Sequence, residues 1–388
     1  MKIALIMPGV GGVRRRGQAR VVPALLAFIE RLSRAHEVSV IALDEEQPRR
    51  YALLGATVVA LGRLTGPGRP ARWLAGLRRL ISTLRSLGGR FDVLHAFWAD
   101  RSASWAVSAG RLLNVPVVVS IGGGELAWIS EIGYGSQGRW LSKVMTSWVL
   151  RAADAVSSPS WYARAPLARK RPDAVRLPCG VDCSLFGGTA ERSQGPPWRL
   201  LQVASINRVK DQATLLSAVR LVRDRGFAVE LDCIGEDTLD GDLKRRAIEL
   251  NLGETVRFHG FKPLGEVIPF YHCAHLYVQS SLHESMGAAV LEAAAAGTPA
   301  VGTEVGLVAE MAPSAALAVP VRDPAALAEG MIALLTDEQR RVQLGRRAQQ
   351  FARTYDADWT VAQFEALYTR VRRERVLGLG SRRERILL

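Results

Sequence analysis

Two periodicities alternate along almost the whole chain. Short apolar runs, typical of strands buried in a parallel sheet, are followed by stretches with apolar residues at helical spacing. In the first half, the pattern predicts strands over 2–7, 37–43, 91–98, 115–121 and 154–158, and helices over 21–35, 69–90 and 140–152. In the second half, it predicts strands over 200–205, 229–234, 256–258, 276–279, 299–302 and 317–319, with helices between most of them. This alternation predicts an α/β fold with two doubly wound parallel sheets.

The stretch 187–197 separates the two halves. It is rich in Gly, Pro, Ser and Thr, a composition typical of a linker. We therefore predict a first domain over 1–180, a hinge or linker over 181–198, a second domain over 199–354, and a C-terminal segment over 355–388.

Length and composition indicate a globular protein of the cytoplasm. The 388 residues are 48% hydrophobic, enough for two or three domains with real cores. Because no run of about 18 apolar residues appears, we expect no transmembrane helix. The N-terminus carries one charge and a very short apolar run, which predicts a first strand rather than a signal peptide. The four cysteines form no Cys-x-x-Cys pair, so we expect buried thiols rather than disulfides.

The positive charge belongs to the first half of the chain. Residues 1–180 hold 26 Lys and Arg against 11 Asp and Glu, whereas residues 181–388 hold 25 against 26. This asymmetry indicates an anionic partner for the first half better than a general use of arginine on surfaces would. The predicted helix 69–90 holds six arginines and no acid, with Trp73 among its apolar residues. It suits an anionic membrane surface, although an ordinary helix with its apolar face inward is the simpler explanation.

Four features of the first half lie near the ends of predicted strands. The glycine-rich turn 8–12 permits close approach of a ligand, but it lacks the full dinucleotide-binding fingerprint. The three arginines of 14–16 fit either a solvated loop or a contact with phosphate or sulfate. His95 lies near a strand end, and both a structural role and a ligand contact remain open for it. The run 122–125, three glycines and a glutamate, forms another close-approach loop.

The densest signal lies in residues 282–303. A Glu-Ser-Met-Gly turn ending at Gly287 leads into an alanine-rich helix, which Gly297 and Pro299 end. The N–H groups at such a helix start can bind an anion. Glu284 and Glu292 have seven residues between them, or ~80° around a helix. Both can therefore face one cleft if Glu284 lies just before the first turn.

Cations and polar residues follow other strands of the second half. Arg208 and Lys210 lie after the first strand and before the next helix, where a phosphate at the helix N-terminus would require positive charge. Other candidates at strand ends are Ser205, Gly235, His259, Gly260 and Gly287. Because these carboxyl ends face one crevice, they predict a ligand site.

These motifs together resemble glycosyltransferase family 4, the retaining nucleotide-sugar enzymes with the GT-B fold. The resemblance spans about residues 1–370 and is carried by Glu284-x7-Glu292 with Gly-Thr-Pro299 after it, Leu-Pro-Cys-Gly-Val-Asp-Cys-Ser-Leu-Phe186 and Ala-Ser-Ile-Asn-Arg-Val-Lys-Asp211. It implies two Rossmann-like domains facing a central cleft. The first would bind the acceptor and the second the donor. We also expect segment 355–388 to return as a helix to the first domain and to end in a basic tail.

The resemblance assigns roles to particular residues. It implies that Glu284 meets the donor sugar, that Glu292 binds the ribose hydroxyls, and that Lys210, helped by Arg208, neutralises the departing diphosphate. The residues implied to bind sugar or phosphate oxygens through backbone N–H groups are Met286, Gly287 and Ala288, with Gly11 and Gly12 approaching the diphosphate from the first domain. The implied reaction retains configuration and needs no metal or other cofactor. A UDP- or GDP-sugar is the expected co-substrate.

Two positions depart from the family pattern. Many relatives carry a His where this chain has Gly122, so that contact with the sugar is absent or is supplied by Glu125 or by backbone N–H groups such as that of Gly123. Relatives often carry Arg at the position of Ser205, for which Arg208 can substitute. Both departures concern the sugar and the rate more than the fold.

The resemblance also predicts the cellular role. We expect a hexosyltransferase that acts on a lipid-linked or polysaccharide acceptor in cell-envelope or exopolysaccharide synthesis, peripheral on the inner face of the cytoplasmic membrane through its basic first half. One alternative is another GT-B sugar-nucleotide enzyme, such as an epimerase. The other is a basic nucleic-acid-binding protein. Because the chain shows no stacking platform or reading motif, we expect no nucleic-acid partner.

Overall fold

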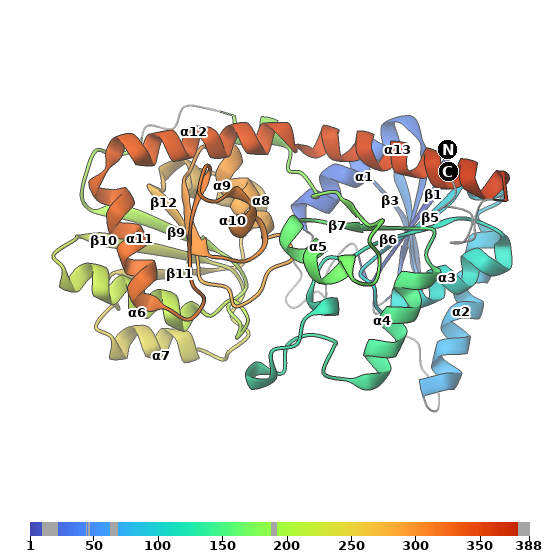
Figure 1. The fold of residues 1–388 in the computed structure, drawn as a ribbon, viewed down its shortest axis with the longest axis horizontal. Coiled ribbons are helices and arrows are strands. Elements are labelled where there is room, and N and C mark those ends of the chain that lie inside the picture. Colours follow the sequence, from blue (N-terminus) through green and yellow to red (C-terminus); the bar gives the residue numbers. More distant parts are fainter. Residues whose placement is uncertain (10–21, 44, 46, 63–68, 188–191, 379–388) are drawn as a thin grey trace. The chain divides into compact units, whose positions relative to one another are not determined.

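The chain forms two compact units, shown as ribbons in Figure 1. The computed structural model describes residues 1–9, 22–43, 45, 47–62, 69–187 and 192–378. The first unit holds Met1–Pro159, Arg164–Cys179 and Ala357–Leu388. The second holds Ser160–Ala163 and Gly180–Asp356. The C-terminal helix therefore belongs to the unit that the N-terminus begins.

The first unit is built on an eight-stranded sheet of order β3-β4-β2-β1-β5-β6-β7-β8. Its strands are β1 (Lys2–Met7), β2 (Glu37–Ala42), β3 (Arg49–Leu53), β4 (Ala56–Ala60), β5 (Val93–Phe97), β6 (Val117–Ser120), β7 (Ala155–Ser158) and β8 (Val175–Arg176). All pairs are parallel except β3 with β4. The helices are α1 (Pro23–Ala35), α2 (Arg69–Ser86), α3 (Arg101–Leu113), α4 (Trp140–Ala152) and α13 (Ala357–Val376), while α5 (Trp161–Ala168) starts in the second unit and ends in the first.

The apolar pattern predicted eight elements of the first half, but it omitted β3, β4, β8, α3 and α5. The predicted strands and helices of the first half are confirmed within a few residues at each end. The pattern gave no sign of the hairpin β3–β4. Its turn places Leu54 and Gly55 at φ 49° and 84°, the left-handed pair that tight hairpins favour. The edge strand β3 begins with two exposed arginines, which hide the strand periodicity.

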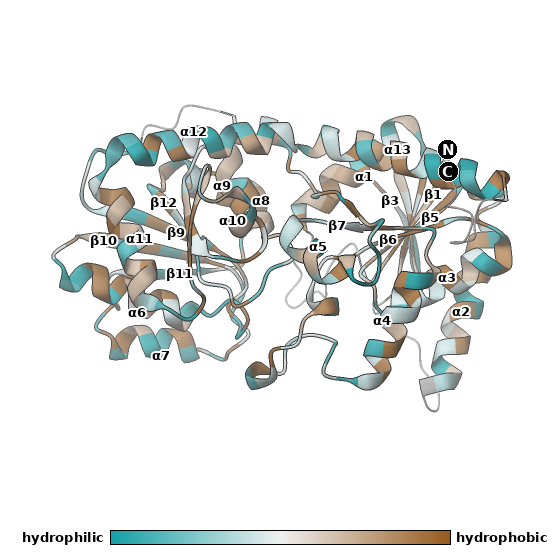
Figure 2. Ribbon diagram, viewed as in Figure 1, coloured by the Kyte–Doolittle hydropathy of each residue, from teal (hydrophilic) through white to brown (hydrophobic). Residues whose placement is uncertain are grey.

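Helix α13 completes the core of the first unit. Its buried side chains join the apolar cluster of β1, β2 and α1, and they are Val361, Phe364, Leu367, Tyr368 and Val371. Helix α1 packs directly against it. Figure 2 shows apolar residues on the strands of both sheets and polar ones on the outer faces of helices such as α12.

Helix α2 is an ordinary covering helix. The indole Nε1 of Trp73 donates to Ser104 Oγ of α3 at 2.9 Å, and Gly76 lies against the ring of Trp105. The side chains of Arg72 and Arg78 are exposed. The apolar side of this basic helix is therefore already occupied by α3. Among the described residues, no helix combines the length and apolar character needed to cross a bilayer.

The second unit is built on a six-stranded parallel sheet of order β11-β10-β9-β12-β13-β14. Its strands are β9 (Trp198–Val203), β10 (Val229–Ile234), β11 (Val256–Gly260), β12 (Leu276–Gln279), β13 (Ala300–Thr303) and β14 (Ala316–Val319). Its helices are α6 (Gln212–Asp224), α7 (Asp242–Glu249), α8 (Leu264–Cys273), α9 (Ala288–Ala295), α10 (Gly306–Met311), α11 (Pro324–Thr336) and α12 (Glu338–Thr354). All six strands predicted here are confirmed.

The strand order of the second unit reverses between β9 and β12. The chain builds β9, β10 and β11 outward to one side, then starts β12 on the other side of β9. At such a point the loops after the two central strands diverge and leave a crevice that ligands use. The loop after β9 carries Lys210, and the loop after β12 carries Glu284. The topology therefore brings together residues far apart in the chain.

The cysteines carry free thiols, as the sequence predicted. They are Cys179, Cys183, Cys233 and Cys273. Of these, only Cys233 is fully buried.

Candidate functional site

A glycine with left-handed backbone shapes the start of α9. Gly287 precedes the helix with φ +86°, in the left-handed region that side chains rarely adopt. A Cβ there would lie 3.1 Å from Oε1 of Gln279. At Gly306, a Cβ would lie 2.5 Å from the carbonyl oxygen of Met286. The same oxygen accepts a hydrogen bond from the backbone N–H of Leu307 at 2.7 Å. The first N–H groups of a helix have no intrahelical acceptor, so this turn offers donors to an anion.

Lys210 and Glu284 meet beside that turn. The Lys210 ammonium forms an ion pair with Glu284 Oε1, which also accepts a hydrogen bond from Ser281 Oγ at 2.9 Å. The backbone N–H of Leu282 donates to the carbonyl of Val209 at 2.8 Å and ties the two loops together. The lysine side chain is 24% exposed and the glutamate side chain 13%, so both reach solvent from a partly buried position. The structure thus pairs the cation and the first carboxylate predicted from the sequence.

Two further residues that the sequence did not indicate, Ser160 and Tyr162, contact residues next to Glu284. Burial raises the pKa of Tyr162, and the negative charge of Glu284 raises it further, which places the phenol near that carboxylate. The Tyr162 ring lies 5.7 Å from the ring of His283 between centroids. Ser160 Oγ donates to the carbonyl of Ser285 at 2.6 Å. In the sequence, Ser160 and Tyr162 are marked only by their position shortly after strand β7, which belongs to the first unit.

Glu292 lies inside the second unit. The residue is 5% exposed, and its Oε2 accepts a hydrogen bond from Tyr271 Oη at 2.7 Å. Burial raises the pKa of Glu292, and this hydrogen bond opposes the rise. Burial also raises the pKa of Tyr271 far above its usual range, so its hydroxyl remains a donor. Tyr271 therefore fixes the orientation of the carboxylate.

The remaining loops of this sheet edge meet through glycines. Gly235 adopts φ +152°, and a Cβ there would lie 1.9 Å from the carbonyl oxygen of Ala204, so only glycine fits. Its N–H donates to the carbonyl of Gly260 at 2.8 Å, which joins the loop after β10 to the end of β11. Ser205 and Arg208 are exposed on the loop after β9. These residues form the rim of the same carboxyl edge.

The side chain of His259 is directed elsewhere. Its Nε2 lies 2.7 Å from Asp232 Oδ1, and its ring packs edge-on against Phe270 of α8, 4.9 Å between centroids. Together with Arg199 and Cys273, these groups line a pocket beside α8. For a ligand at the rim, His259 therefore offers its backbone rather than its imidazole.

His95 of the first unit lies wholly in the core. Its Nδ1 is 2.6 Å from Tyr368 Oη, and its Nε2 is 2.7 Å from Ser120 Oγ. The residue has no exposed surface, and burial lowers its pKa to about 3. Both nitrogens are engaged by protein groups, and this placement favours the structural role over the ligand contact.

Glu125 organises the loop at Gly122 and Gly123. Its carboxylate accepts the N–H groups of Gly122 at 3.0 Å, Gly123 at 2.6 Å and Ala99 at 3.2 Å, and the residue is 5% exposed. The carboxylate is therefore directed inward to the backbone. A Cβ at Gly122 would lie 3.2 Å from Nε1 of Trp98, itself in the left-handed region at φ 67°. The indole of Trp98 therefore lies next to Gly122, the position at which the resemblance led us to expect a His.

Two predicted residues lie outside the described part of the chain. They are Gly11 and Gly12, and the arginines of 14–16 lie there as well.

Family models match both halves of the chain. The model described as glycosyl transferase 4-like domain matches residues 17–180. The model described as glycosyl transferases group 1 matches residues 190–351. Each therefore covers most of one of the two predicted domains.

Curated proteins show the same likeness at moderate identity. A D-inositol 3-phosphate glycosyltransferase of Corynebacterium glutamicum is 30% identical over 216 residues, which cover 51% of this chain and 52% of that protein. A glycogen synthase of Mycobacterium tuberculosis is 29% identical over 301 residues, covering 74% and 70%. The chain thus spans about half the length of the first of these relatives.

Solved structures share the fold. A sucrose-phosphate synthase from Thermosynechococcus elongatus has a TM-score of 0.78 at 20% identity, covering 95% of this chain and 98% of that one. Anabaena HepE, in complex with UDP and glucose, has a TM-score of 0.72 at 14% identity, covering 95% and 99%. At these identities the likeness shows the architecture alone, and it confirms the predicted fold class.

Proposed function

Because the chain belongs to the group 1 glycosyltransferases of the GT-B fold, we propose that it transfers a sugar from a nucleotide diphosphate sugar to an acceptor. The observation that carries this proposal is the ion pair of Lys210 with Glu284 beside the start of α9. Relatives named for glycosyl transfer, and a structural neighbour that binds UDP and glucose, support it.

The cation and the helix start suit the diphosphate. When the donor binds, Lys210 exchanges the Glu284 carboxylate for phosphate oxygens, and the exposed Arg208 adds a second positive charge. The N–H groups at Gly287 and Ala288 meet the same oxygens. Fixed charges and dipoles of this kind stabilise the negative charge that develops on a leaving phosphate. Glu284 is then free to accept hydrogen bonds from the sugar hydroxyls beside the anomeric carbon.

Glu292 is assigned to the ribose. Its Oε2 is held by Tyr271, which leaves Oε1 to accept a hydroxyl hydrogen bond. A buried carboxylate with a fixed orientation strongly favours a ligand whose hydroxyl donates a hydrogen bond to it. Without such a hydroxyl, the carboxylate remains poorly solvated. This arrangement favours a ribonucleotide donor.

The proposed transfer retains the anomeric configuration. The bond between the anomeric carbon and the diphosphate oxygen breaks, and the acceptor oxygen bonds to that carbon on the same face. The departing phosphate oxygen takes the acceptor proton. Lys210 and the α9 start supply the charge stabilisation, so the reaction requires no divalent metal.

A donor panel tests this function. We expect one of the UDP-, GDP- or ADP-sugars to raise the melting temperature, since a ligand at 100 times its Kd stabilises by about 2.7 kcal/mol. Glu284→Gln should abolish transfer while leaving the fold intact. The matched control is Glu266→Gln, which removes a carboxylate from the exposed pair of Lys262 and Glu266. If no donor raises the melting temperature, or if Glu284→Gln is fully active, the assignment of this site is wrong.

The proposed acceptor is lipid-linked or a growing polysaccharide of the cell envelope. The first half of the chain carries the whole basic excess, and anionic membrane surfaces attract such proteins. We therefore place the enzyme in the cytoplasm, peripheral on the inner face of the membrane. Transfer of radiolabelled sugar into an organic-extractable product would support a lipid acceptor, whereas label confined to the aqueous phase would contradict it.

A further inference from the structure

Helix α4 presents apolar side chains to solvent. Trp140 is 71% exposed, Leu141 48% and Val144 58%. At about 100° per residue, these three positions span ~100° of the helix circumference. The buried side chains of α4 lie on the opposite side and are Thr146, Val149 and Leu150. The first two turns therefore carry a second apolar face, which the residues that the structure describes leave exposed.

Basic side chains surround this face. Arg139 and Lys143 are exposed next to it, and Arg151 is exposed two turns further along the same side. Helix α4 itself contains no acidic residue. The face is thus apolar at its centre and positive around it.

Neighbouring elements add cations to the same side of α4. The guanidinium of Arg111 in α3 lies over the ring of Trp148, 5.6 Å from its centroid. Lys170 Nζ donates to Ser147 Oγ at 3.0 Å. Burial lowers the pKa of Lys170, and the positive charges of Lys143 and Arg151 lower it further. Such a concentration of charge favours an anionic partner.

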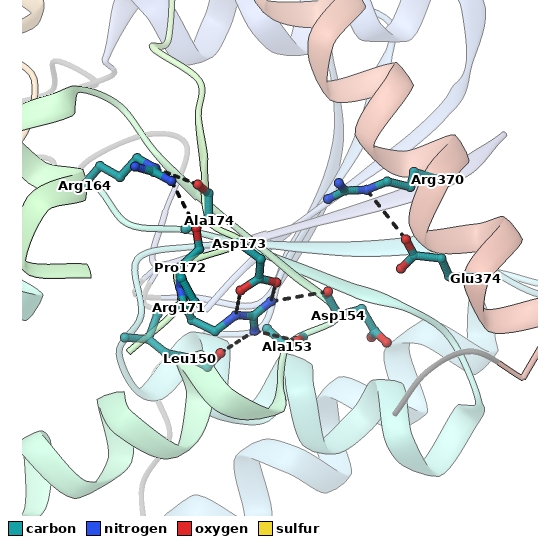
Figure 3. Close-up of polar contacts among 10 residues, drawn as sticks. All are labelled: Leu150, Ala153, Asp154, Arg164, Arg171, Pro172, Asp173, Ala174, Arg370 and Glu374. Atoms are coloured by element: carbon teal, nitrogen blue, oxygen red, sulfur yellow. Dashed lines mark hydrogen bonds and ion pairs between the residues drawn. The ribbon is translucent and has the colours of Figure 1, made fainter. Parts of the chain in front are cut away.

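The other end of α4 is firmly held, as Figure 3 shows. The buried guanidinium of Arg171 donates to the carbonyls of Leu150 at 2.5 Å and Ala153 at 2.9 Å, and it pairs with Asp173. These bonds satisfy carbonyls that a helix end leaves without partners. In Figure 1, the first turn of α4 lies at the end of the helix far from the sheet. A helix anchored at its C-terminus thus presents its apolar N-terminal turns rigidly.

We propose that the α4 edge, defined as Trp140, Leu141 and Val144 with Arg139 and Lys143, docks on an anionic lipid bilayer. A tryptophan among aliphatic side chains and lysine or arginine suits the membrane interface, where the ring sits at the headgroups and the charges meet lipid phosphates. The core of a protein interface is instead depleted of charge. The α4 edge also replaces α2 in this role, since Trp73 of α2 is packed on α3. This inference rests on the proposed function, because docking brings the enzyme to a lipid acceptor.

Vesicle sedimentation with the full chain tests the proposal. We expect binding to vesicles of phosphatidylcholine with phosphatidylglycerol at low salt, and loss of binding to phosphatidylcholine alone or at high salt. The triple variant Trp140→Ser, Leu141→Ser, Val144→Ser should bind on the order of tenfold more weakly. Lys143→Gln alone should weaken binding about fivefold, as ~1 kcal/mol per basic residue predicts. The matched control is Ile248→Ser, which changes an equally exposed aliphatic side chain on α7.

Two other outcomes would overturn the proposal. If the triple variant binds vesicles as the unchanged protein does, the α4 edge is not the contact. If the unchanged protein forms dimers in solution and the triple variant does not, the edge joins two copies instead. The melting-temperature shift with donor is measured on the same samples. Vesicle binding without any donor shift would disprove the proposed function and leave the docking surface standing.

Discussion

Replacing Tyr271 by Phe isolates the hydrogen bond that orients Glu292. The substitution removes one oxygen and keeps the ring, so the core gains no large cavity. The lost bond is to a charged group, and such bonds contribute about 1.5–3 kcal/mol. We therefore expect the second unit to lose ~2 kcal/mol. For a unit of this size, that corresponds to a melting temperature lower by about 4–8 °C.

The loss should depend on pH. Burial already holds the pKa of Glu292 above its usual range, and the Tyr271 donor opposes this rise. Without that donor, the pKa of Glu292 in the folded state rises further. At a pH below the folded-state pKa of Glu292 in both proteins, the carboxyl is protonated in each. The free energy of unfolding that Tyr271→Phe loses is therefore small there. As the pH rises through the two folded-state pKa values, the deficit grows and then stays constant.

Urea unfolding of the single and double variants measures the effect. In a Glu292→Gln background the bond joins neutral groups, so Tyr271→Phe should cost only ~1 kcal/mol. The control is Tyr277→Phe, a buried tyrosine whose hydroxyl has only a 3.5 Å contact with the Val203 carbonyl. The role given to this hydrogen bond would be wrong if Tyr271→Phe lowered the free energy of unfolding equally with Glu292 in place and in the Glu292→Gln background, or if the loss did not depend on pH. Donor affinity should fall in Tyr271→Phe and not in Tyr277→Phe.

Three other predictions concern single features. Gly287→Ala should cost about 1–2 kcal/mol, because alanine is strained at its left-handed φ, and should weaken donor binding; calorimetry showing unchanged stability would contradict this. His95 has a pKa lowered to about 3, so stability present above pH 6.5 should fall by ~1.4 kcal/mol per pH unit as the pH drops toward 3; His95→Gln should lack that slope in acid titrations of unfolding. Chelation of divalent metals with EDTA should leave the initial rate of transfer unchanged, and a loss restored by Mg²⁺ would disprove the role given to Lys210.

The sequence predicted the backbone of the site well. Apolar runs located the strands, and glycines and polar residues located the loops at their carboxyl ends. Because a doubly wound sheet gathers these ends, the proximity of Lys210 to Glu284 followed from the order of elements. That part of the site depends on topology, which local patterns encode.

The sequence did not predict which way the polar side chains point. His95, Glu125 and His259 all lie in or near predicted loops or strand ends, yet each is engaged by a protein partner. Their partners lie in other elements, and no local pattern identifies which polar group will be satisfied internally. The outward face of α4 was missed for the related reason that Trp140 and Val144 resemble core residues until their surroundings are known.

The place of α13 in the first unit has a consequence during synthesis. The ribosome makes β1 long before α13, so the core around β1 lacks Phe364, Leu367 and Tyr368 until α13 has emerged. The second unit ends at Asp356 and can complete its core earlier. The nascent chain therefore finishes its units in the reverse of the order in which it starts them. A premature stop codon before α13 would release a folded second unit attached to an open, aggregation-prone first one.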